Sequence, residues 1–481
     1  MKVSLSSASL GVLAVLGLAA PVSAETLREA LAKTYVSNPT LNGARAGQRA
    51  NDENVPLARS RGLPDLTLSG GYTENLKNSA NNFNSPTRLV SGRLAVAVPL
   101  YVGGSVRNAI RGADSRVSAG QADLRGAESD IFTATVGAYM DVLRDEAIVG
   151  LNQKQVRVLQ TNLEATKDRF DVGDLTRTDI AQSEARLATA QSQLEGTEAQ
   201  LITSRERYVQ IVGSPPGKLD QPPALPNLPA SVDMAVQTAL ADNPDLLAAK
   251  DNSTAAKFDV KSAKGARLPR VQAVANADYT NFLNTLGSGV PGVSFAQVTT
   301  TSSAGLQASL PLFQGGEPGA QIRQAQARSS QSQERVIEIE RAVISQTRAA
   351  YASWQASNAV IASSEKAVSA NTLSLEGVRA ENSVGNRSIL DILNAEQELL
   401  QSQVNLVSAR RNAYVAGFAL LAAMGQAEAR DLGLDGGPLY DPQVHYNRVD
   451  KKLWEWGGSI EPPIQSTRTV DTPAQTPSVK P

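Results

Sequence analysis

Pro99-Leu100-Tyr101-Val102-Gly103-Gly104 recurs in this chain as Pro311-Leu312-Phe313-Gln314-Gly315-Gly316. The second copy lies 212 residues after the first, and the same offset relates Val172-Gly173 to Val384-Gly385 and Gly213 to Gly425. Nearer the N-terminus, Asn38-Pro39 and Leu63-Pro64 recur 205 residues later, as Asn243-Pro244 and Leu268-Pro269. Matched motifs in the same order indicate an internal duplication, with two halves of similar structure.

Each half carries the same series of local signals. Asn-Pro predicts a helix start, because asparagine caps a helix and proline fits its first position. Alternating apolar and small polar residues then predict a strand pair, at about 64–100 in the first half and 269–312 in the second. After Gly-Gly, proline is absent from Ser105 to about Phe170, which predicts a helix of about 65 residues, or roughly 100 Å. Val-Gly breaks this helix, and a second helix returns along it.

These signals divide the chain into five parts. We predict a signal peptide at 1–24, a first repeat at 25–213 with its hairpin tip near 173, a proline-rich linker at 214–230, a second repeat at 231–425 with its tip near 385, and a largely disordered tail at 426–481. The signal peptide rests on Lys2, on the apolar run from Ala8 to Ala20, and on the small residues that end at Ala24. That run is too short for a comfortable transmembrane helix, so the mature chain is expected to start at Glu25.

The composition excludes several kinds of function. One histidine and no cysteine rule out thiol nucleophiles, disulfide frameworks and zinc sites of the Cys/His type. A formal net charge of −1 gives no basic surplus that would suggest nucleic acid. No phosphate-binding glycine loop or nucleophile motif is visible. We therefore expect no enzyme activity and no cofactor.

No apolar run beyond the signal peptide approaches membrane-helix length, so a membrane crossing would have to be a β-barrel. Aromatic residues gather in both strand segments, which suits the girdles of an outer-membrane barrel, although two soluble hairpins would explain them equally well. Four strands per chain are too few to close a barrel, since small barrels have about eight. Closure would need several chains: two would supply eight strands and three would supply twelve.

The duplicated series of motifs resembles the TolC-type outer-membrane channel family over roughly residues 25 to 430. The resemblance implies a mainly α fold with β structure: long duplicated helical hairpins that form a trimeric α-barrel in the periplasm, plus four strands per chain in a trimeric transmembrane β-barrel. It also implies a homotrimer in outer-membrane lipid, with a periplasmic adaptor and an inner-membrane transporter as partners.

The resemblance also suggests site residues at the periplasmic hairpin tips. The two Val-Gly turns, Val172-Gly173 and Val384-Gly385, match the tips that the adaptor touches. Arg387 matches an arginine that links the two hairpins, Thr178 and Asp179 match its partners, and Asp391 matches an acidic ring at the constriction. Two positions depart from the pattern of the best-known member. Asn382 replaces a linking tyrosine and Asn394 replaces a second ring aspartate. The alternative is that Arg387 and Asp391 are ordinary solvated charges near a helix end.

The expected function is an outer-membrane exit channel for type I protein secretion, gated at its periplasmic end. The missing lipoprotein cysteine favours secretion over the lipidated drug-efflux branch. Multidrug or small-molecule efflux is the main alternative. A soluble periplasmic coiled-coil adaptor is a weaker one, because adaptors usually carry one hairpin rather than two in tandem.

Overall fold

The computed structural model describes residues 24–77, 85–287, 292–434, 439–453, 456 and 463–479. The expected signal peptide therefore lies outside the described residues, apart from Ala24. The first half contains α1 (Leu27–Ser37), α2 (Pro39–Asp52), α3 (Asn54–Ser60), β1 (Asp65–Glu74), β2 (Arg88–Val102), α4 (Ser105–Asp171) and α5 (Arg177–Val212). The second half contains α6 (Val232–Asp242), α7 (Pro244–Lys264), the 3-10 turn η1 (Gly265–Arg267), β3 (Arg270–Asn281), β4 (Val298–Ser309), α8 (Glu317–Ser383) and α9 (Ile389–Ala423), and α10 (Pro442–Val449) follows.

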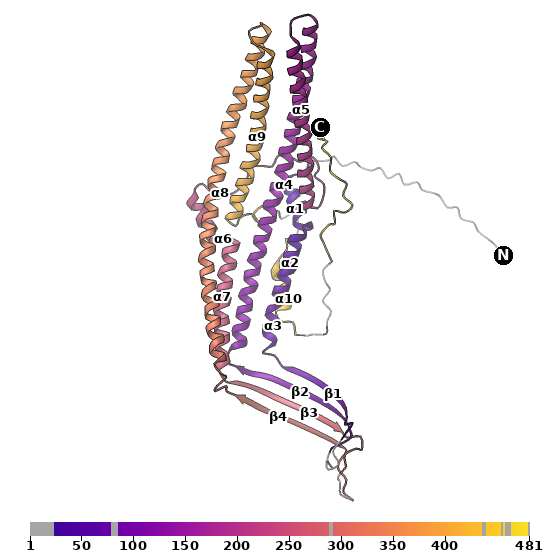
Figure 1. Cartoon of the computed structure of the whole chain (residues 1–481). Coiled ribbons are helices and arrows are strands. Elements are labelled where there is room, and N and C mark those ends of the chain that lie inside the picture. The colour runs from indigo at the N-terminus through magenta and orange to yellow at the C-terminus, as the bar shows by residue number, and fades with distance from the viewer. Residues whose placement is uncertain are drawn as a thin grey trace, which may run out of the picture.

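The molecule is elongated, with a sheet at one end and two helical hairpins at the other (Figure 1). The helices α4 and α8 have 67 residues each, so each is about 100 Å long. The shorter helices α5 and α9 return along them and complete the hairpins α4–α5 and α8–α9. Nearer the sheet, α7 contacts both α4 and α8, while α2 and α3 contact α4. Each half thus has one continuous long helix and one interrupted partner.

A capping asparagine joins the interrupted helices in each half. Asn38 accepts hydrogen bonds from Thr40 N and Leu41 N at the start of α2, and its amide donates to the carbonyl of Ile211 at the end of α5 (2.9 Å). Asn243 likewise accepts a bond from Leu246 N in α7 and donates to the carbonyl of Ala423 in α9 (3.0 Å). One side chain satisfies polar groups at two helix ends, which would otherwise lack partners. The predicted helix starts at Asn-Pro are confirmed.

The four strands form one antiparallel sheet in the order β1-β2-β3-β4. Register shifts once, between Pro99 and Tyr101 in β2, where proline cannot donate a ladder hydrogen bond. Every residue of the edge strands β1 and β4 is exposed, including the large apolar side chains of Leu66, Leu68 and Leu306. The sheet of one chain therefore leaves two open edges and apolar side chains in contact with solvent.

The principal core lies where the helices from both halves meet. Tyr139 and Phe132 from α4, Tyr208 from α5, and Phe418 and Leu420 from α9 are all at most 1% exposed. Burying such large aromatic groups stabilises the fold strongly. Across the described residues, no helix is both long enough and apolar enough to cross a membrane.

The C-terminal tail differs from the expectation of a largely disordered segment. Its described residues include α10, and Tyr440 N donates to the hydroxyl of Tyr35 (2.8 Å). Farther along, the guanidinium of Arg205 donates to the carbonyl of Ser478 (3.1 Å). Apolar residues at the start of the tail, such as Ala427 and Leu434, are buried in the principal core, and polar contacts to much earlier parts of the chain hold the described residues that follow.

Candidate gate at the hairpin tips

Both hairpin tips are short exposed turns built around one glycine. Gly173 and Gly385 have φ values of +86° and +80°, a left-handed conformation that glycine adopts without strain. The preceding valines, Val172 and Val384, are 77% and 70% exposed. The turns α4–α5 and α8–α9 lie at the end of the molecule farthest from the sheet (Figure 1), so each presents one exposed apolar side chain there.

Arg387 belongs to a local cluster at the second tip. Its Nε donates to Oε2 of Glu381 at 2.7 Å, and this carboxylate raises the pKa of the guanidinium. Asn382 donates to the carbonyl of Arg387 at 2.7 Å. Within one chain, the structure therefore pairs Arg387 with its own hairpin and does not bring it to Thr178 or Asp179.

Asp179 and Asp391 have the same role at the start of the two returning helices. Each is the third residue of its helix and completes a capping box, in which Asp179 pairs with Thr176 and Asp391 pairs with Ser388. The hydroxyl of Ser388 donates to Oδ2 of Asp391 at 2.7 Å, and these hydrogen bonds hold the pKa of Asp391 below 3.8. Thr178 lies exposed on the first turn of α5. Both carboxylates are therefore fixed, only partly exposed and ionised near the tips.

A buried acid joins the two hairpins farther from the turns. Glu396 on α9 is 3% exposed. The amide of Asn162 on α4 donates to both of its carboxylate oxygens at 3.1 Å, and Arg379 on α8 donates to Oε1 at 3.0 Å. Side chains from three helices meet at one carboxylate, which fixes the first hairpin to the second.

Arg186 on α5 forms a second connection between the hairpins. Its two terminal nitrogens donate to Oδ1 of Asn394 (2.7 Å) and Oε1 of Gln397 (2.5 Å), both on α9. Asn394, which we expected to line the constriction, therefore accepts a hydrogen bond from the other hairpin. A planar guanidinium group is suited to donating two hydrogen bonds at once in this way.

The sequence analysis missed Glu396, Arg186, Asn162 and Arg379. One local signal was available for Glu396, which shares a helical face with the apolar residues Ile392 and Leu393. An acid three or four residues from buried apolar side chains lies on the same face of the helix, and a buried carboxylate needs a hydrogen-bond donor or a cation beside it. The partner itself could not be found locally, because Asn162 is 234 residues away.

An open-edged sheet joined to two long, mutually attached helical hairpins is the architecture of an outer-membrane channel subunit. The model of the outer membrane efflux protein family matches residues 30–214 and 235–426, one segment in each repeat. The chain belongs to this family, and the resemblance to TolC-type channels is confirmed. It is therefore an outer-membrane protein that also spans the periplasm, in a family of channels.

Three known proteins show how far the similarity extends. The outer membrane efflux protein BepC of Brucella suis is 34% identical over 91% of this chain and 92% of its own length. The alkaline protease secretion protein AprF of Pseudomonas aeruginosa is 29% identical over 68% of each chain. The crystal structure of the CmeC outer-membrane channel of Campylobacter jejuni has a TM-score of 0.73, with 15% identity over 94% of this chain and 98% of that one. At that identity, the likeness to CmeC is one of fold.

Proposed function

We propose that this protein is the outer-membrane exit duct of a tripartite export system, working with a periplasmic adaptor and an inner-membrane transporter. The observation that carries the proposal is the arrangement of one chain: an open-edged sheet at one end and two connected hairpins with exposed tips at the other. Such a chain cannot enclose a passage by itself. Several copies around an axis can enclose one along their whole length.

Three copies are the assembly that we propose. The edge strands β1 and β4 can each pair with a neighbouring chain, so that every open edge is satisfied. Three sheets of four strands would give a twelve-stranded barrel in outer-membrane lipid, and the hairpins would form a helical tube in the periplasm. The exposed apolar residues of the strands, such as Leu66 and Leu306, then have a lipid or protein environment.

The gate is proposed at the periplasmic end, close to the two tips. The residues assigned to it are Arg387, Asp391, Asp179, Thr178, Asn394 and Asn382. Asp391 supplies a fixed negative charge, and threefold symmetry would place three such carboxylates around the axis, which favours cations. Arg387 is exposed and its partner Glu381 is on the same tip, so its guanidinium can contact a neighbouring chain.

The adaptor is proposed to bind the tips through Val172, Gly173, Val384 and Gly385. The support is that both valine side chains are largely exposed although they are apolar. A protein partner that covered them would remove this apolar area from water.

Two classes of cargo have separate support. Protein secretion is favoured by the similarity to AprF, whose name assigns it to alkaline protease secretion, and by the absence of a lipoprotein cysteine. Small-molecule efflux is favoured by the similarity to BepC, which is named an efflux protein. We place protein secretion first and keep efflux as the second candidate.

A deletion strain tests the proposal and separates the two cargo classes. We expect it to lose one or more proteins from the culture medium, and complementation with the intact gene to restore them. Hypersensitivity to a panel of toxic compounds with unchanged secreted proteins would assign the channel to efflux instead. A strain unchanged in both respects, when grown under conditions in which the parent makes the channel, would contradict an export role.

A further inference from the structure

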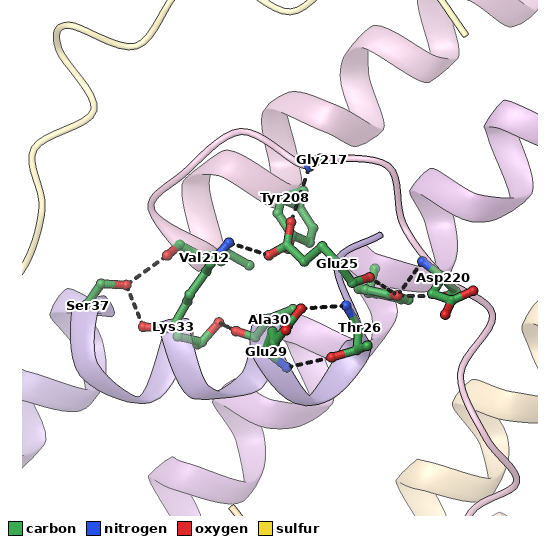
Figure 2. A network of polar contacts seen from close by, with 12 residues as sticks. Glu25, Thr26, Glu29, Ala30, Lys33, Ser37, Tyr208, Val212, Gly217 and Asp220 are labelled. Atoms are coloured by element: carbon green, nitrogen blue, oxygen red, sulfur yellow. Dashed lines mark hydrogen bonds and ion pairs between the residues drawn. The ribbon is translucent and has the colours of Figure 1, made fainter. Parts of the chain in front are cut away.

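Glu25 occupies a buried polar site where four segments of the chain meet. Its carboxylate is 8% exposed and accepts hydrogen bonds from Lys33 Nζ (2.7 Å) and the Tyr208 hydroxyl (2.9 Å) through Oε1. Oε2 accepts one from Gly217 N (3.2 Å). Figure 2 shows these donors around the carboxylate, from α1, α5 and the linker between the repeats.

The backbone of Glu25 is held as firmly as its side chain. Its nitrogen donates to the carbonyl of Lys218 (2.7 Å), and its carbonyl accepts from Asp220 N (3.0 Å), which makes a parallel bridge with the linker. The hydroxyl of Tyr139 on α4 lies 2.8 Å from the same carbonyl. The backbone at Glu25 is thus paired with the linker that connects the two repeats.

The second repeat provides an internal comparison at the equivalent place. Tyr351, which matches Tyr139, donates to the carbonyl of Ala230 (3.3 Å), which matches Glu25. The backbone arrangement is therefore similar, but the charged and polar side chains are not repeated. Alanine stands in place of Glu25, Leu420 in place of Tyr208 and Thr238 in place of Lys33.

The two places differ in what precedes them in the sequence. Ala230 is in the interior of the chain, whereas Glu25 directly follows the small residues Val22-Ser23-Ala24 of a signal-peptide cleavage pattern. An endopeptidase that hydrolyses the Ala24–Glu25 bond consumes one water and leaves a carboxylate on Ala24 and an ammonium group on Glu25. The first repeat, in which cleavage creates a positive charge, is thus the one that carries the buried carboxylate of Glu25.

We propose that signal-peptide removal at Ala24–Glu25 creates an α-ammonium group that is bound in this network, donates to the carbonyl of Lys218 and balances the charge of the buried Glu25 carboxylate. Lys33, the other cation of the network, is 49% exposed and therefore a weaker source of compensation. Processing thereby completes the contact between the N-terminus and the inter-repeat linker. The proposal concerns removal of the signal peptide, so it does not depend on which cargo the channel carries or on which residues form the gate.

Selective labelling of the N-terminal amine tests the proposal on the exported protein. The intact mass should correspond to a chain that begins at Glu25. A bound ammonium group loses its proton less readily, so an amine-reactive ester at neutral pH should label it about tenfold more slowly in the folded protein than after denaturation. A chain that begins elsewhere, or an amine that reacts equally fast in both states, would overturn the proposal.

Variants separate the ion pair from general burial of the N-terminus. Glu25→Met should speed labelling of the folded protein by about tenfold, since the carboxylate is lost while an unbranched side chain of similar length is kept. Methionine is used because an N-terminal glutamine would cyclise and lose the amine. The control Glu53→Gln changes an exposed acid and should leave the rate unchanged. A Gly-Ser insertion after Ala24 keeps the carboxylate but displaces the amine, and should give fast labelling. If Glu25→Met labels as slowly as the parent, the carboxylate is not the counter-ion.

Discussion

Asn162 and Glu396 are 234 residues apart in sequence, yet the amide of Asn162 lies 3.1 Å from each carboxylate oxygen of Glu396. The contact joins α4 of the first hairpin to α9 of the second. Since Glu396 is almost fully buried and also binds Arg379, it is the most enclosed polar connection between the hairpins that we find in the described residues.

Glu396→Ala should destabilise the protein by about 1–3 kcal/mol, because the donors of Asn162 and Arg379 lose a buried acceptor. Chemical denaturation followed by circular dichroism measures the change. Glu398→Ala, at an exposed position on the same helix, is the matched control and should change stability by no more than about 0.5 kcal/mol. Equal effects of the two substitutions would show that the buried contact is not important.

Arg387→Ser should raise the open probability of the channel in planar bilayers, because it removes the guanidinium assigned to the closed gate. Arg328→Ser removes an exposed arginine from α8, far from the tips, and should behave like the parent. If both variants gate like the parent, the assignment of Arg387 is wrong.

The cation preference of the channel should depend on Asp391. Asp391→Asn should weaken it, and Asp391→Ala should weaken it to a similar extent, which reversal potentials in a salt gradient would measure. In the parent, hydrogen bonds from Ser388 hold the pKa of Asp391 below 3.8, so the charge is present at neutral pH and is lost only as the pH falls through that lowered value. The preference should therefore be constant above about pH 5. A loss of preference with a midpoint above pH 5 would point to another group.

Asn38→Ala and Asn243→Ala should each destabilise the protein by about 1–2 kcal/mol, because each removes a helix cap together with a hydrogen bond to the C-terminal end of the returning helix, α5 or α9. Thermal unfolding would measure both. The control Asn358→Ala lies on the exposed face of α8 and should have little effect. Similar losses in the two repeats are expected, since the duplicated asparagines make the same contacts. A large loss in one repeat alone would contradict that equivalence.

His445→Ala should loosen α10 from the body of the protein. The Nδ1 atom of His445 lies 2.9 Å from a carboxylate oxygen of Asp52, which is 0% exposed. Burial raises the pKa of Asp52, and His445 lowers it. Without the imidazole, the ionised carboxylate is less stable, so the cost should be about 1–3 kcal/mol at neutral pH and should fall as the pH is lowered.

Hydrogen exchange of residues 442–449 would measure this loosening. Adding Asp52→Asn to the histidine variant removes the buried charge and should restore part of the protection. Unchanged exchange in His445→Ala would show that other contacts, such as that between Tyr446 and Asp114 (3.0 Å), hold the helix without help from His445.

Elements with strong local signals could be located from the sequence. The helix expected after Gly103-Gly104 starts at Ser105, and α4 and α8 end at the Val-Gly turns that were expected to break them. Strands β1 to β4 lie inside the segments that alternate apolar and small polar residues, except for Tyr101 and Val102 at the end of β2. These positions depend on glycine, proline and short-range periodicity, which act within a few residues.

Contacts between distant parts of the chain could not be located in this way. The partners of Glu396, Arg186 and Glu25 are set by how the two repeats pack, which no local pattern specifies. The position of the tail could not be predicted either. Its glycine, proline and polar residues suggested disorder, whereas its described part buries Leu434 in the core and forms polar bonds with Arg205 and Tyr35. At the tips, the family resemblance predicted Arg387, Asp391 and Asn394 as gate residues. The structure of one chain adds Arg186, which links the first hairpin to Asn394.

Conductance of the purified protein in a planar lipid bilayer tests the central claim most directly. We predict discrete conductance steps that require the assembled trimer, disappear when heat dissociates it, and respond to Arg387→Ser at one end of the pore. A correctly assembled, membrane-inserted protein that passes no ions, in the parent and in Arg387→Ser alike, would contradict the claim that it is an exit duct.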